Sequence, residues 1–281
     1  MASTIVCGVD TSDAAAAVAE TAHWLARGLG ARLLVLHVSE KPTSEGEELA
    51  SLRERLNLPA GDVCSTDGTP ADRLLEAIER DGAELLVVGS RGRGSISSAV
   101  LGSVSRRLTT DARCPVVVVP PDAGAPSRSD SSGASIVCGA DGSDHSIAAA
   151  RLAGELARRM GYRLIVVHAL AGPKSYVSYP GARDTAPSPA TQPDAAERLA
   201  REIVDTAVDA AGGDATGVVE SGVPWDVLQD VADREDGRLL VVAARGLSAA
   251  RAALFGSVAT TLATNGRYPL AVLPEAAEHA S

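Results

Sequence analysis

A glycine-rich turn between an apolar run and an expected helix is the part of this sequence best suited to chemistry. The apolar run 85–88 leads directly into Gly89-Ser90-Arg91-Gly92, and after nine intervening residues Gly102-Ser103 opens a stretch, 103–111, that we expect to be helical. Glycine lets backbone N–H groups approach an anion because no Cβ stands in the way. The first turn of a helix adds N–H donors without intrahelical partners and a partial positive charge. A strand, a glycine turn and a helix N-terminus in this order predict a site for the phosphates of a nucleotide.

Much of the chain is an internal repeat. Residues 5–13 and 136–144 are identical at seven of nine positions. The offset between the copies is 131 residues up to His168 and 154 residues from Gly222 onwards, so the second copy carries 23 additional residues. Repeats of this length indicate two tandem domains rather than a solenoid.

The repeat predicts the domain organisation. We expect a first domain over residues 1–121, a linker over 122–134 and a second domain over 135–281. The linker is rich in Pro, Ser, Gly and Asp, which is typical of an exposed connection. The additional residues fall at about 172–192 and show no helical period. This insert is expected to be a surface loop, with a lid or a partner site as the alternative.

Each copy alternates short apolar runs with helical patterns, which predicts an α/β fold. The runs are continuously apolar, as in parallel strands covered by helices on both faces. Five strands joined by right-handed crossovers predict two tandem doubly wound domains, each a five-stranded parallel sheet in the order 3-2-1-4-5. In that order the winding reverses between the first and fourth strands, and ligands bind beyond the strand ends at such a point. Asp10 follows the first strand and Gly89 the fourth, so both are expected in one crevice.

Composition and charge exclude several classes of partner. The net charge of −10 and the isoelectric point of about 5.0 argue against a nucleic-acid partner. No apolar run approaches the roughly 18 residues of a membrane span, and no signal-peptide pattern opens the sequence. The four cysteines form no CxxC pair, so we expect reduced core residues in a cytoplasmic protein rather than metal ligands.

Several polar residues allow more than one interpretation. Asp10 could cap the first helix or contact the ligand. His37 and His168, at matching strand ends, are expected to be structural rather than catalytic. Arg91 and Arg245 also match between the copies and could be solvated, bind phosphate or join the domains. No nucleophile elbow, HExxH or Walker lysine occurs, and no base is positioned to activate water, so we expect no catalytic residues.

These motifs resemble the universal stress protein family in its tandem two-domain form. The ATP-binding branch of that family carries G-x2-G-x9-G-[S/T] after the fourth strand, and Gly89, Gly92, Gly102 and Ser103 match it in full. The resemblance implies that Asp10 meets the ribose or phosphate region, that the main chain around Val38 borders the adenine, and that the glycine motif wraps the triphosphate. It also implies a divalent metal, Mg²⁺, between phosphate oxygens; its protein ligands are unknown.

The second copy departs from the pattern at one point. It retains Asp141, Gly246, Gly256 and Ser257, but Ala243-Ala244 stands where the first copy has Gly89-Ser90. If Gly89 has a positive φ or lets the main chain approach a phosphate, Ala243 weakens the second site; if the φ of Ala243 is negative, Ala243 is harmless. The expected nucleotide-binding residues are Asp10, Val38, Gly89, Arg91, Gly92, Gly102, Ser103 and Val104 in the first copy, and Asp141, Ala169, Gly246, Gly256, Ser257 and Val258 in the second.

The sequence and the resemblance together predict an ATP-binding sensor or regulator of the stress response, with adenine nucleotide as its ligand. A slow ATPase and an interaction scaffold with vestigial sites are the alternatives. The resemblance further implies that the last strands, 116–119 and 270–273, pair with each other across the domains. Such apolar strands would invite aggregation if left bare. A homodimer is also expected.

Overall fold

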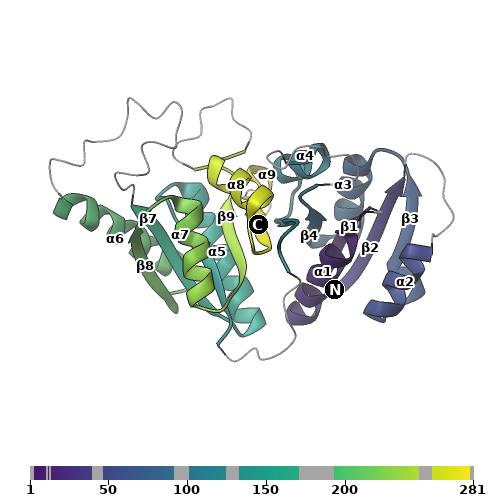
Figure 1. Cartoon of the computed structure of the whole chain (residues 1–281), viewed down its shortest axis with the longest axis horizontal. Coiled ribbons are helices and arrows are strands. Elements are labelled where there is room, and N and C mark those ends of the chain that lie inside the picture. The colour runs from purple at the N-terminus through teal and green to yellow at the C-terminus, as the bar shows by residue number, and fades with distance from the viewer. Residues whose placement is uncertain are drawn as a thin grey trace.

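One sheet of ten strands runs through the molecule (Figure 1). The computed structural model describes residues 3–10, 12, 14–39, 47–91, 101–124, 133–170, 193–246 and 255–278. The strand order is β3-β2-β1-β4-β5-β10-β9-β6-β7-β8, so each half of the sheet has the predicted order 3-2-1-4-5. Every strand pair within a half is parallel. The strands are β1 Thr4–Val9, β2 Arg32–Ser39, β3 Val63–Asp67, β4 Ala83–Gly89 and β5 Val116–Val119, then β6 Ser135–Gly139, β7 Arg163–Leu170, β8 Ala215–Ser221, β9 Gly237–Ala243 and β10 Leu270–Leu273.

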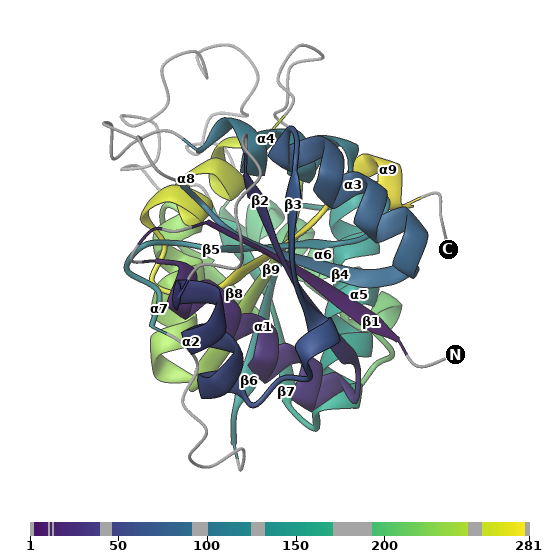
Figure 2. The same cartoon turned by 90° about the vertical axis from the view of Figure 1, so that its right-hand side faces the viewer.

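Helices cover both faces of the sheet, which confirms the predicted α/β class (Figure 2). One face carries α1 Ala15–Leu29, α2 Glu47–Leu56, α5 Asp144–Met160, α6 Pro193–Ala210 and α9 Glu275–Glu278. The other carries α3 Pro70–Asp81, α4 Ser103–Asp111, α7 Pro224–Arg234 and α8 Ser257–Asn265. A short 3-10 turn, Ala60–Asp62, precedes β3.

The hydrophobic core consists of two clusters, one on each face of the sheet. Successive strand residues alternate between them, so Ile5 and Cys7 belong to one cluster and Val6 to the other. All four residues of β5 are buried, because helices cover this strand on both sides. Each cluster contains residues from both copies of the repeat. The two copies therefore share their cores across the junction.

The last strands of the two halves pair with each other, as predicted, and they run antiparallel. Strand β10 pairs with β5 in the register Leu270↔Val118, Ala271↔Val117 and Val272↔Val116. Pairing satisfies the backbone hydrogen bonds of two apolar edge strands that would otherwise be exposed. The two five-stranded halves thereby form one continuous sheet of ten strands.

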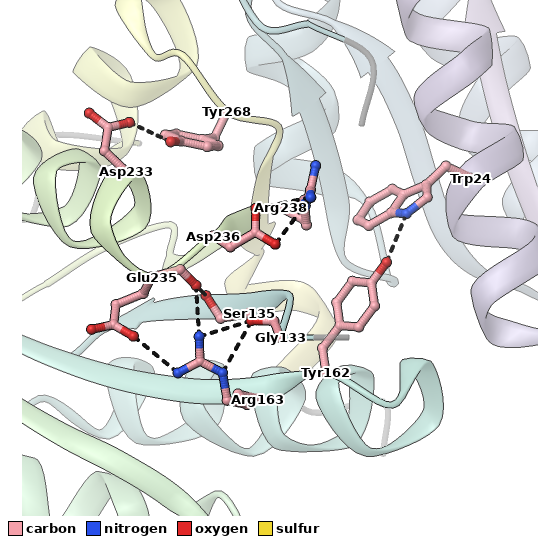
Figure 3. Close-up of polar contacts among 10 residues, drawn as sticks. All are labelled: Trp24, Gly133, Ser135, Tyr162, Arg163, Asp233, Glu235, Asp236, Arg238 and Tyr268. Carbon is pink, nitrogen blue, oxygen red and sulfur yellow. Dashed lines mark hydrogen bonds and ion pairs between the residues drawn. The ribbon is translucent and has the colours of Figure 1, made fainter. Parts of the chain in front are cut away.

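Side chains reinforce this junction on the face that carries α1 and α5. Trp24 Nε1 donates to Tyr162 Oη at 3.1 Å, and the two rings stack with centroids 6.2 Å apart (Figure 3). Arg159 forms an ion pair with Glu84 at 2.7 Å and also donates to the carbonyl of Leu29 at 3.0 Å. The hydrogen bond to Glu84 raises the pKa of the Arg159 guanidinium. These contacts fix the orientation of the two halves.

Three of the four cysteines lie in the hydrophobic core. Cys7, Cys114 and Cys138 are buried, Cys64 is half-buried, and all four are free thiols. Burial raises the pKa of Cys114 and of Cys138 to about 12 and that of Cys7 further, so these thiols stay protonated and unreactive. None of the helices in the described ranges is both long enough and apolar enough to cross a lipid bilayer.

Candidate functional site

The residues predicted to share a crevice lie where the winding of each half reverses. Strands β1 and β4 are neighbours in the register Gly8↔Val88, so Asp10 and the turn after Gly89 lie at the same edge of the sheet. In the second half a Cβ added to Gly246 would overlap Asp141 Oδ2. The acid after β6 therefore lies directly against the glycine turn after β9. Gly92, the counterpart of Gly246, lies outside the described residues, as does the insert at 172–192.

The two acids are held by the serines that follow them. Asp10 Oδ1 accepts hydrogen bonds from the backbone N of Ser12 at 3.1 Å and from its Oγ at 2.5 Å. Asp141 Oδ1 accepts the same pair from Ser143 at 3.0 and 2.6 Å. Helix α1 has Ala14 at its N-cap and α5 has Ser143, so the interpretation of Asp10 as a helix cap is wrong. Both acids instead close a local turn that orients the carboxylate at the strand end.

Two matching histidines support the same strand ends. His37 Nδ1 lies 3.1 Å from the carbonyl O of Val9, and His168 Nδ1 lies 2.8 Å from that of Ala140. A carbonyl can only accept, so Nδ1 carries the proton in each ring. Each histidine thus ties its strand to the residue just before the acid. Both histidines therefore have a structural contact at the predicted strand ends, and the absence of a catalytic role stays a prediction.

A hydrogen bond joins the turn after β4 to the start of α4. Gly102, the N-cap of α4, donates its backbone N–H to Ser90 O at 2.8 Å, and in the second half Gly256 donates to Ala244 O at 2.7 Å. A Cβ on Gly102 would lie 3.2 Å from Ser90 O, and one on Gly256 would lie 3.3 Å from Ala244 O. The close approach of the two segments therefore favours glycine at both positions. We call this contact the turn–helix clasp.

The first turn of α4 has the properties of an anion site. No described side chain caps α4 or α8. Ser103 is exposed at the first helical position and Val104 is half-buried at the second. The N–H groups of a first helical turn need partners from outside the helix, and an anion supplies them. Val38 and Ala169, at the predicted adenine edge, are half-buried against the same apolar cluster as Val104 and Val258.

The difference between Gly89 and Ala243 has a steric explanation. Both residues end a strand, and neither has a φ in the left-handed region. A Cβ on Gly89 would lie 3.2 Å from the backbone O of Arg91 and 3.3 Å from Val18 Cγ2. The repeat places Ala149 where the first copy has Val18, and both residues are buried. The second copy thus exchanges a glycine–valine pair for an alanine–alanine pair, and Ala243 is accommodated.

Gly89→Ala is expected to destabilise the protein by about 1–2 kcal/mol, because the new methyl group crowds Val18 and the backbone O of Arg91. Val18→Ala alone removes two buried methyl groups and should cost about 1–2 kcal/mol. The double variant should cost at least about 1 kcal/mol less than the sum, because each change relieves the other. Urea unfolding of the four proteins measures this coupling. Strictly additive effects would disprove the steric explanation.

The matching arginines lie at or near the junction of the two halves. Arg91 Nη2 donates to the carbonyl O of Thr264 at 3.0 Å, in the last turn of α8. A cation is favourable there because carbonyl groups without helical partners point outward. Arg245 Nη1 forms an ion pair with Glu275 of α9 at 2.8 Å, and α9 packs against α4 of the first half. Arg91 therefore joins the domains, and its contact with phosphate stays a prediction.

One residue that supports the clasp was not predicted from the sequence. Ser105, in the first turn of α4, donates its Oγ to the carbonyl O of Gly89 at 2.6 Å. No motif identifies this serine, and the only available signal was its replacement by Ala259 in the second copy.

Known proteins are similar to this chain in sequence. A model described as the universal stress protein family matches residues 1–62, 47–120 and 134–274. A universal stress protein of Thermus aquaticus is 35% identical over 136 residues, which cover 42% of this chain and 99% of that protein. One of Mycobacterium tuberculosis is 33% identical over 208 residues, covering 73% of this chain and 65% of the relative.

Solved structures share the fold across the full length of the chain. A putative universal stress protein from Pseudomonas aeruginosa superposes with a TM-score of 0.63 at 16% identity, covering 96% of this chain and 92% of its own. A second protein from Pseudomonas aeruginosa, of unknown function, gives a TM-score of 0.66 at 16% identity, covering 99% and 94%. At this level of identity the likeness concerns the fold alone.

Proposed function

The chain belongs to the universal stress protein family, and on that premise we propose that it binds ATP with Mg²⁺ and acts as a nucleotide-dependent sensor or regulator in the stress response. The observation that carries the proposal is the turn–helix clasp. It holds the uncapped first turn of α4 beside the end of β4, where the winding of the sheet reverses. Ligands of doubly wound folds bind at this point.

The residues of the first half fit a nucleoside triphosphate. Backbone N–H groups of Ser103 and Val104 would donate to phosphate oxygens, and Gly102 lets the start of α4 lie close to the turn after β4. Asp10, fixed by Ser12, would meet the ribose or phosphate region. The main chain around Val38 would border the adenine. In the second half Asp141, Ala169, Gly246, Gly256, Ser257 and Val258 would form a second site.

The metal would be held chiefly by the nucleotide. The described residues include no group of three or more His, Cys, Asp or Glu side chains that could hold a metal ion. Mg²⁺ commonly takes one or two carboxylates together with substrate phosphates and keeps several waters. When bound, it would offset the charge of the phosphates, which the main-chain donors offset only in part.

Isothermal titration of the nucleotide-free protein with MgATP tests the proposal. We expect two binding events per chain, because Ala149 makes room for Ala243 in the second half. Magnesium tripolyphosphate should bind more weakly, because it lacks the adenosine that Val38 and Ala169 would border. Release of phosphate from ATP, measured in parallel, should be slow, as expected for a sensor. Absence of binding at millimolar MgATP would contradict the proposal.

A further inference from the structure

The two halves differ in one hydroxyl group that lies next to the turn–helix clasp. In the first half Ser105 is 3% exposed and its Oγ donates to Gly89 O at 2.6 Å. The repeat places Ala259, which is 2% exposed, at the same point of α8. Both positions are therefore buried, and only the first can form a side-chain hydrogen bond to the strand end.

This hydrogen bond adds a second attachment to the clasp. The start of α4 is tied to the β4 end through Gly102 N to Ser90 O and through Ser105 Oγ to Gly89 O. The start of α8 has the equivalent of the first bond, from Gly256 N to Ala244 O, but Ala259 carries no hydroxyl group that could form the equivalent of the second. Two attachments at successive residues fix both the distance and the orientation of a helix end, whereas one leaves it free to pivot.

Two neighbouring hydroxyl groups do not take the place of the Ser105 hydroxyl. Thr260 Oγ1 in α8 donates to Gly256 O at 2.9 Å, which is a bond within its own helix. Ser90 Oγ in the turn is buried and has no hydrogen-bond partner among the described residues. Ser105 is thus the side chain whose hydroxyl joins helix α4 to strand β4.

The orientation of α4 matters because its first-turn N–H groups would receive the phosphates. Donors held in place before binding cost less to order when the ligand arrives. If only a fraction of molecules has the helix end in the binding orientation, the apparent dissociation constant rises by the inverse of that fraction. A missing attachment therefore weakens binding without removing any ligand contact.

We propose that Ser105 is a positioning residue that makes the first half the tighter nucleotide site, and that Ala259 makes the second half the weaker one. This inference rests on the proposed function. It assigns the asymmetry to the clasp rather than to the exchange of Gly89 for Ala243, because neither residue has a left-handed φ and Ala149 occupies less space than Val18.

Reciprocal substitutions test the proposal by titration with MgATP. Ser105→Ala should weaken the tighter site about fivefold, which is the usual contribution of one buried hydrogen bond. Ala259→Ser should tighten the weaker site by a similar factor while Ser105 remains in place. Thr109→Val is the matched control, because Thr109 is buried in α4 and its hydroxyl bonds only within that helix. It should lower stability and leave both affinities unchanged.

Hydrogen exchange of the nucleotide-free protein gives an independent readout. Ser105→Ala should accelerate exchange at the first turn of α4, and Thr109→Val should not. If the unmodified protein binds MgATP but Ser105→Ala and Ala259→Ser leave both affinities unchanged, the inference alone is overturned. If the unmodified protein fails to bind MgATP, the proposed function is overturned and the inference with it.

Discussion

Valine in place of Gly102 is expected to abolish MgATP binding in the first half of the chain. A Cβ at this position would lie 3.2 Å from Ser90 O and 3.5 Å from Arg91 Cα, and valine adds two further methyl groups. The turn and the helix must then separate, which breaks the bond from Gly102 N to Ser90 O. Losing two charge-assisted hydrogen bonds to phosphate corresponds to an affinity loss of at least about 100-fold. Isothermal titration with MgATP measures it.

Gly124→Val is the control for this change. Gly124 is exposed, and a Cβ there would meet no atom within 4 Å, so the same substitution should leave both sites intact. Gly256→Val should remove the second site and spare the first. MgATP bound by Gly102→Val with the affinity of the unmodified protein would show that the phosphates do not lie at the start of α4.

Alanine in place of Gly154 is expected to lower the free energy of unfolding by about 3 kcal/mol or more. Helix propensity alone predicts the opposite sign, because alanine is favoured over glycine inside a helix by about 1 kcal/mol. Gly154 lies inside α5, and an added Cβ would overlap Ala211 O and lie 2.9 Å from its carbonyl carbon. That backbone directly follows α6, so α5 and α6 must move apart and expose the core between them.

Gly28→Ala is the matched control for the Gly154 variant. Gly28 also lies inside a helix on this face of the sheet, but its added Cβ would meet only the flexible end of Met160, at 2.8 Å from Cε. We expect stability to be unchanged or raised by up to about 1 kcal/mol. Urea unfolding followed by circular dichroism compares the two variants. Equal stabilities would refute the packing argument at Gly154.

Much of the fold could be predicted from local sequence patterns. The repeat, the apolar runs and the alternation of strands and helices predicted two halves with the order 3-2-1-4-5, and the structure has this order. The placement of Asp10 and Gly89 at adjacent strand ends followed from that order. These features are predictable because strand burial, helix periodicity and crossover handedness act over short stretches of chain.

The tertiary structure decided what depends on contacts between distant residues. The space for a Cβ at Gly89 depends on Val18, which lies in another element, and the position of Arg91 depends on a carbonyl of α8 in the other half. The bond of Ser105 to Gly89 depends on where α4 packs against the end of β4. No single segment encodes these contacts, because each arises only when packing brings two elements within a few ångströms. The sequence alone therefore determined the architecture and the edge of the sheet that carries the candidate site, whereas packing decided which side chains hold that site in shape.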